Sequence, residues 1–276
     1  MSRAKANGIE LEHETFGDPA APPLLLIAGL GMQMVGWDVE FCELLASRGF
    51  RVIRFDNRDA GLSEWPERAY TLEDMADDAV GLLDALGITA AHVVGVSMGG
   101  FIAQLVALNH PERVLTLTSM ISGPNGQDQV PPTAEGTAVL MAPAPQTRDE
   151  RIALGLHSKR ALLGPMDPFD EAWERRRIER AIDRAYNPAG FIRQLAAIMA
   201  ATGRIERLRS LRVPALVIHG DHDILVPVEN GRHVAAAIPG ARLVEIPGMG
   251  HDVPRRIWPQ VADAIAALAK QAATAC

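Results

Sequence analysis

The stretch HVVGVSMGGFIAQLVALN, residues 92–109, decides the fold of this chain. It begins with an apolar run typical of a strand buried on both faces and ends with the pattern of a helix. At the junction, Gly95, Ser97 and Gly99 spell G-x-S-x-G. A sharp strand-to-helix turn of this kind exposes the serine hydroxyl above the end of the strand, where it can act as a nucleophile. The alternative is an ordinary glycine-rich turn in a doubly wound sheet.

Short apolar runs alternate with helical patterns on both sides of this stretch. We expect strands at residues 24–28, 51–55, 92–96, 114–117, 215–219 and 242–246, and helices at 72–86, 98–109, 229–237 and 257–272. This alternation predicts an α/β fold with a mostly parallel sheet and helices on both faces. Residues 8–16 alternate between apolar and polar side chains, which indicates an antiparallel strand at the edge of that sheet.

The alternation stops between residues 123 and 212. A loop rich in Pro, Gly and Gln comes first, and helical patterns without strands follow at 148–163, 170–186 and 188–202. Because the strand pattern resumes directly afterwards, we predict a core of residues 1–122 and 213–276 with a helical cap, or lid, inserted at 123–212. A separate helical domain is the alternative. Apolar side chains of the cap can line an acyl pocket or pack the cap onto the core.

A serine hydroxyl needs a neighbouring imidazole to take its proton. His251 follows the last expected strand on the glycine-rich loop PGMGH, which can carry its ring to the edge of the sheet where parallel strands end. For the carboxylate that orients this imidazole, the loop after the preceding strand offers Asp221 and Asp223. We predict Asp223, because it fits the spacing G-x-x-D-x-x-x-P and the chain order Ser, Asp, His. Asp221 is expected to cap the turn.

The tetrahedral intermediate of ester cleavage needs two N–H donors aimed at its oxyanion. We predict the backbone N–H of Met98, the residue after the nucleophile, as one donor. The N–H of Leu30 is predicted as the other, because Gly29 and Gly31 let the backbone approach closely. An ordinary turn at the end of a strand would contain the same residues.

Composition excludes several classes of function. The formal net charge is −7, so a nucleic-acid partner is not expected. The arginine run at 175–177 is interleaved with acidic residues and predicts a solvated helix face with i,i+4 ion pairs. The two cysteines, Cys42 and Cys276, show no metal-binding spacing, and a structural disulfide between them is not expected. We predict no metal and no organic cofactor.

The ends and the apolar runs of the sequence bear on localisation. The N-terminal residues 1–14 contain no apolar segment typical of a signal peptide, and the longest strongly apolar run is too short to cross a bilayer. We therefore expect a cytoplasmic protein with no integral membrane segment. The sequence does not indicate an oligomeric state.

Six short runs together resemble the α/β-hydrolase superfamily over residues 5 to 272. They are LIAGLG (26–31), DNRDAGLS (56–63), GVSMG (95–99), HPER (110–113), HGDHDILVP (219–227) and IPGMGH (246–251). More narrowly, the chain is similar to the aclacinomycin methylesterase-like bacterial hydrolases. The resemblance implies Ser97, Asp223 and His251 as a catalytic triad, Leu30 and Met98 as oxyanion donors, and a cap over the pocket.

The sequence departs from the family pattern at two positions. Many members carry a histidine where this chain has Ala28, and Asp59 stands where the turn motif D-x-R-G-x-G-x-S has its first glycine. We expect that motif to hold a loop together without a catalytic role.

These features predict a serine hydrolase that cleaves a small-molecule carboxylic ester through an acyl-enzyme on Ser97. The ester is of small to medium size, a methyl ester or a lactone. One alternative is a cofactor-free perhydrolase or haloperoxidase, or an acyltransferase, with the same triad. Another, of a different class, is a non-catalytic ligand-binding receptor of this fold. Enzymes of this fold that use a carboxylate nucleophile are excluded, because position 97 is serine.

Overall fold

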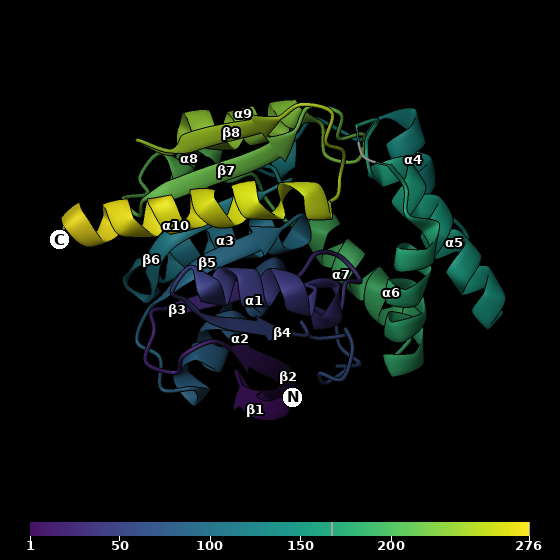
Figure 1. The fold of residues 1–276 in the computed structure, drawn as a ribbon, viewed down its shortest axis with the longest axis horizontal. Helices are drawn as coiled ribbons and strands as arrows, with labels where there is room; N and C mark the ends of the chain where they lie inside the picture. Colours follow the sequence, from purple (N-terminus) through teal and green to yellow (C-terminus); the bar gives the residue numbers. More distant parts are fainter. Residues whose placement is uncertain (167, 276) are drawn as a thin grey trace.

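The computed structural model describes residues 1–166 and 168–275, and its central feature is an eight-stranded sheet of order β1-β2-β4-β3-β5-β6-β7-β8 (Figure 1). The strands are β1 (Ser2–Ala6), β2 (Ile9–Phe16), β3 (Pro23–Ile27), β4 (Arg51–Phe55), β5 (Ala91–Val96), β6 (Val114–Met120), β7 (Ala215–Gly220) and β8 (Arg242–Ile246). The β1–β2 and β2–β4 pairs are antiparallel, and every pair from β4 to β8 is parallel. The carboxyl ends of these parallel strands therefore meet at one edge of the sheet.

Helices cover both faces of the sheet and enclose two apolar clusters. The helices α1 (Val39–Ser47) and α10 (Trp258–Ala275) cover one face, and α2 (Leu72–Ala85), α3 (Met98–Asn109), α8 (Ile205–Leu208) and α9 (Val228–Ala237) cover the other (Figure 1). The 3-10 turns are η1 (Met34–Gly36), η2 (Pro111–Arg113), η3 (Gly126–Asp128) and η4 (Arg255–Ile257). Strand β5 is buried along its whole length, as its continuous apolar sequence requires.

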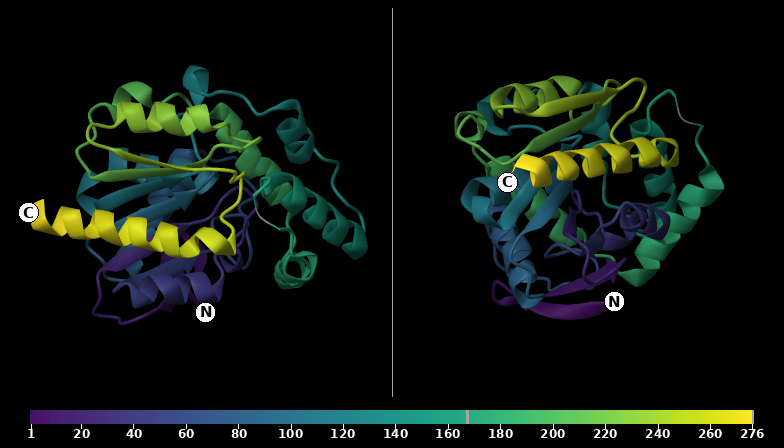
Figure 2. Two further views of the ribbon diagram at one scale, coloured as in Figure 1. Left: turned by 45° about the horizontal axis from the view of Figure 1, so that its top comes forward. Right: turned by 60° about the vertical axis from the view of Figure 1, so that its left-hand side comes forward.

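In the described part of the chain, four helices besides α8 lie between β6 and β7. They are α4 (Ala134–Leu140), α5 (Arg148–Leu162), α6 (Glu171–Arg184) and α7 (Pro188–Ala200), and we call them the cap helices. Both views of Figure 2 and the view of Figure 1 show them beside the sheet, next to the loops that follow β7 and β8. Our division into core and cap stays a prediction. Among the described residues, no helix has the length and apolarity needed to span a membrane.

The predicted α/β fold, with its mostly parallel sheet and helices on both faces, is confirmed, and the structure differs from the expected elements in three details. The strand predicted as the edge, β2, lies inside the sheet, because the short strand β1 pairs with its outer side. Helix α1 was not predicted. Helix α4 occupies part of the segment expected to be a loop.

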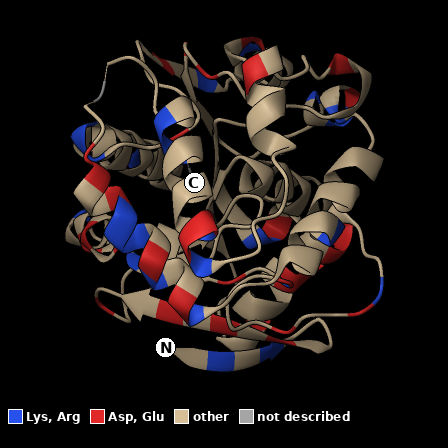
Figure 3. Cartoon of the chain, turned by 90° about the vertical axis from the view of Figure 1, so that its right-hand side faces the viewer, with Lys and Arg blue, Asp and Glu red and all other residues tan. Residues whose placement is uncertain are grey.

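The arginine run on α6 differs in part from the solvated face that was predicted. Arg175 does form an exposed i,i+4 ion pair with Glu171. Arg177 and Arg184, in contrast, are mostly buried and pair with core carboxylates, the first with Asp38 at 2.9 Å. Figure 3, which views the molecule from the side of the cap helices, shows positive and negative residues mixed along these helices. This helix face therefore attaches the cap to the core. Cys42 is buried with a free thiol, and Cys276 lies outside the described residues.

Candidate active site

Ser97 lies in the turn between β5 and α3 with strained backbone angles, φ 55° and ψ −120°. Positive φ is costly for a residue with a side chain, so the surrounding packing must enforce it. Two glycines make the turn possible. A Cβ on Gly95 would come within 1.9 Å of the Gly99 oxygen, and one on Gly99 within 2.1 Å of the Ile27 oxygen. The turn holds the Ser97 side chain at the carboxyl edge of the sheet.

His251 and Asp223 approach Ser97 from the loops after β8 and β7. His251 Nε2 is 2.9 Å from Ser97 Oγ, and His251 Nδ1 is 2.7 Å from Asp223 Oδ2. In the tautomer that carries its proton on Nδ1, the imidazole donates to Asp223, and its Nε2 accepts from the serine hydroxyl. This arrangement fits a nucleophile, a general base and an orienting carboxylate.

The Asp223 carboxylate is buried and fully engaged. Its Oδ1 accepts hydrogen bonds from the backbone N–H groups of Leu225 and Val226. A second imidazole, that of His219, lies 3.4 Å from Oδ2 and also contacts the Val226 oxygen at 2.7 Å. Burial alone would raise the pKa of Asp223, but His251 and His219 outweigh it and lower this pKa to about 2. Asp223 is therefore an anion at neutral pH.

The side chain of Asp221 joins two loops, whereas it was expected to cap its own turn. Its Oδ1 accepts from the Gly248 N–H at 2.6 Å and contacts His222 Nδ1 at 2.7 Å. These contacts connect the loop after β7 to the loop that carries His251, so Asp221 supports the site without touching Ser97.

The predicted oxyanion donors border the nucleophile. Leu30 follows Gly29, on which an added Cβ would lie 3.3 Å from the Cβ of Ser97. Met98 is the first residue of α3, so its N–H belongs to the unpaired donors at the helix N-terminus. Within the described residues, neither of these two N–H groups has a hydrogen-bond acceptor. Both are available to an incoming oxygen atom.

A cavity of about 570 Å³ opens at Ser97 and His251, which both line it. Its walls are largely apolar and come from the core and from the cap helices. The cap contributes Val139, Leu140, Leu162, Ile178, Phe191, Leu195, Ile198 and Met199. The apolar side chains of the cap thus do both things that the sequence left open. Some line the cavity, and others pack onto the core, where Ala197 of α7 joins one apolar cluster and Trp173 of α6 packs against the other.

One wall of this cavity carries charges. Lys159 of α5 pairs with Asp252, the residue after His251, at 3.0 Å. Arg177 pairs with Glu174 at 2.9 Å. Lys159 and Arg177 hold the pKa of Asp252 below its usual value against the opposing effect of burial. Sequence reasoning missed this polar wall, because it forms only when α5 and α6 meet the loop after β8.

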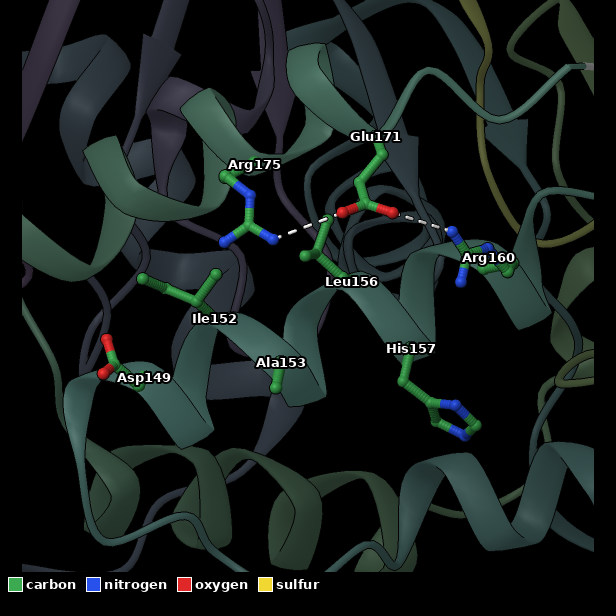
Figure 4. Close-up of a pocket in the computed structure, with 8 residues that line it drawn as sticks. All are labelled: Asp149, Ile152, Ala153, Leu156, His157, Arg160, Glu171 and Arg175. Atoms are coloured by element: carbon green, nitrogen blue, oxygen red, sulfur yellow. Dashed lines mark hydrogen bonds and ion pairs between the residues drawn. The ribbon is translucent and has the colours of Figure 1, made fainter.

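A second hollow lies between α5 and α6 (Figure 4). Its lining residues come from these two helices alone, and its rim carries Glu171 between Arg160 and Arg175. None of the predicted catalytic residues borders it. In the described part of the chain, no three His, Cys, Asp or Glu side chains cluster as metal ligands would.

A family model for the alpha/beta hydrolase fold matches residues 22–254. The chain belongs to the α/β-hydrolase family. Rhodomycin D methylesterases from Streptomyces sp. (strain C5) and Streptomyces peucetius are 37% and 36% identical to it, each over 94% of this chain and 94% of the relative. The crystal structure of an enol-lactonase from Burkholderia xenovorans LB400 is similar with a TM-score of 0.75 and 28% identity, over 99% of this chain and 100% of that one.

These similarities confirm two predictions made from the sequence. The first is the resemblance to methylesterase-like members of the family. The second is the class of enzyme, a carboxylic ester hydrolase.

Proposed function

We propose that this α/β-hydrolase cleaves its ester through an acyl-enzyme on Ser97. The single observation that carries the proposal is the chain of contacts from Ser97 Oγ through His251 to Asp223, at 2.9 and 2.7 Å. In the first step Ser97 Oγ attacks the ester carbonyl while His251 Nε2 takes the hydroxyl proton. The N–H groups of Leu30 and Met98 bind the oxyanion, and His251 then protonates the departing alcohol.

In the second step, water attacks the acyl-enzyme and His251 again takes the proton, so the free acid leaves and Ser97 is restored. Asp223 keeps the imidazole in the productive tautomer and stabilises the imidazolium that forms. The depressed pKa of Asp223 supports this role, because the carboxylate remains charged throughout the neutral range.

For the substrate, we propose a methyl ester or lactone on a bulky, largely apolar molecule. The cavity volume of about 570 Å³ suits an organic molecule much larger than a simple acetate. The methylesterases at 37% and 36% identity and the enol-lactonase support these two ester types. We propose that the apolar cap residues hold the acid portion of the substrate. Residues 123–212 are proposed to form this cap, inserted in a core of residues 1–122 and 213–276.

The test is hydrolysis of p-nitrophenyl esters from acetate to decanoate by the wild type and by Ser97→Ala. We expect wild-type turnover with a longer-chain optimum and a rate at background in the variant. Turnover that survives in Ser97→Ala would reject the acyl-enzyme. Adding hydrogen peroxide tests the alternative, since peracid in place of carboxylic acid as the main product would indicate a perhydrolase. Stoichiometric labelling by a fluorophosphonate without turnover of any ester or lactone would favour a receptor.

A further inference from the structure

Gln194 of α7 connects the cap to the loop that carries Leu30. It is 1% exposed. Its Oε1 accepts a hydrogen bond from the Gly31 N–H at 2.8 Å, and its Nε2 donates to the Arg58 oxygen at 2.8 Å. One buried amide thus joins three segments that lie far apart in the sequence.

Several hydrogen bonds hold the loop that follows β3. From the core, the Asn57 side chain donates to the Ala28 oxygen at 3.0 Å, and Asp56 Oδ1 accepts from the Met34 N–H at 2.6 Å. From the cap, α6 holds Gln33, whose Nε2 donates to the Ala181 oxygen at 2.7 Å. At Gly31, next to Leu30, the contact comes from Gln194 of α7.

Gly31 needs this external support because its backbone lies in the left-handed region, with φ 66°. A glycine has more backbone freedom than any other residue, so the peptide between Leu30 and Gly31 can rotate unless its groups are held. The Phe191 ring of α7 packs against Gly31, since a Cβ added to this glycine would come within 2.8 Å of the ring. Helix α7 therefore restrains this peptide by one hydrogen bond and one close packing contact.

We infer that Gln194 is a positioning residue that aims the Leu30 N–H at the oxyanion by holding the adjacent Gly31 peptide. The inference rests on the proposed function. When the Gly31 N–H loses its acceptor, the Leu30–Gly31 peptide rotates within the turn that the Met32 N–H closes on the Gly29 oxygen at 3.2 Å. The preceding peptide, which carries the Leu30 N–H, shifts as that turn changes shape. The ester still binds, but the tetrahedral intermediate loses one of its two aligned donors. The cap is then part of the catalytic geometry as well as a cover for the cavity.

The test compares Gln194→Met with Ile192→Gln, a matched control two positions away on the same helix. Methionine keeps the length of the side chain and removes both hydrogen bonds. Ile192 is 61% exposed and does not line the cavity at Ser97, so Ile192→Gln changes α7 without touching the loop of Leu30. Turnover of p-nitrophenyl acetate and inhibition by a trifluoromethyl ketone, which forms a tetrahedral oxyanion on the serine, are measured for each protein.

For Gln194→Met we expect kcat to fall about 10- to 100-fold with little change in KM, because a donor is misaligned in the transition state alone. Affinity for the trifluoromethyl ketone should fall by the same factor as kcat/KM. Gln194→Glu keeps an acceptor for the Gly31 N–H and should retain more activity than Gln194→Met. Ile192→Gln should stay close to the wild type in kcat and in ketone affinity.

The inference is overturned if Gln194→Met loses no more kcat than Ile192→Gln, or if ketone affinity stays unchanged while kcat/KM falls. If Gln194→Met does not fold, Gln194→Asn, whose amide is too short to reach Gly31, carries the same comparison. Loss of the proposed function is a separate result, because it appears as turnover that persists in Ser97→Ala.

Discussion

The edge of the sheet and the cap helices are built on different physical principles, although both border the same cavity. Helix α3, which follows Ser97, is buried along nearly its whole length, and β5 and β7 are buried throughout. On α6, in contrast, the side chains that are mostly or fully buried include the charged residues Glu174, Arg177 and Arg184. The core side is held by apolar burial and the cap side by polar contacts.

Two ion pairs of the cap meet one short segment of the core. The motif at residues 56–63 was expected only to hold a loop together, but it also forms ion pairs with the cap helices. Asp56 pairs with Arg184 at 2.6 Å, and Asp59 pairs with Arg193 and accepts from Tyr70 at 2.7 Å. Asp59 is the residue that departs from the family glycine, and its φ of 68° is positive. This departure therefore provides an anchor for α7.

The difference predicts that substitutions in the two regions change the stability of the protein to different extents. Apolar burial around the sheet is spread over many contacts, so no single one of these contacts dominates the stability of the core. The cap depends on a few charged pairs whose partners are taken out of water, and removing one partner leaves an uncompensated buried charge.

The largest effect is expected at the edge of the sheet. Asp223→Asn should lower kcat about 10⁴-fold, because the amide stabilises the wrong histidine tautomer and cannot balance the imidazolium. Steady-state kinetics on a p-nitrophenyl ester measures this. Asp221→Asn is the matched control two residues away and should lose far less. A greater loss in Asp221→Asn than in Asp223→Asn would reverse the assignment of the acid.

The next effect is expected between the cap and the core. Arg184→Met should lower the free energy of unfolding by about 3 to 5 kcal/mol, because Asp56, whose side chain is 0% exposed, keeps a charge without its partner. Chemical denaturation measures this loss. Arg148→Ala on α5 breaks an exposed pair with Asp183 and should leave the midpoint unchanged. Equal midpoints for both variants would show that the cap is not held by its buried charges.

The smallest of the three effects is expected inside the core, at His92 of β5. Its ring is buried against Thr116, and burial lowers its pKa from 6.5 to about 4. The unfolded state therefore binds more protons than the folded state between these two pH values. The wild type should lose up to about 3 kcal/mol of stability as pH falls from 6.5 to 4. In His92→Gln this contribution is absent, so the free energy of unfolding should fall by about 3 kcal/mol less over the same pH interval. Denaturation curves at several pH values measure the difference. Equal pH slopes in the two proteins would contradict the burial of a neutral imidazole.

The sequence predicted most of the sheet and the triad candidates because their signals are local. Apolar runs mark buried strands, and motifs such as PGMGH place a residue type in a particular turn. Helix α1 has a helical pattern of apolar residues, the buried Phe41, Cys42 and Leu45, but it carries no functional motif. Strand β1 is short and mostly polar, so only its pairing with β2 defines it.

The contacts between cap and core could not be predicted from the sequence. Gln194 and Gly31 are separated by 163 positions, and Arg184 and Asp56 meet only after both regions have folded. An arginine-rich helix face has the same pattern whether it faces water or a set of core carboxylates. Which carboxylates it meets depends on tertiary packing, for which this pattern contains no local signal.

The acyl-enzyme on Ser97 is the central claim, and rapid-quench mass spectrometry tests it most directly. The wild type is mixed with p-nitrophenyl acetate, quenched within the first turnover, digested and sequenced by fragmentation. We predict an acetyl group on Ser97 that forms with the nitrophenol burst and disappears at the rate of turnover. Steady turnover with no acetyl group on Ser97, or with the acetyl group on another residue, would contradict the mechanism.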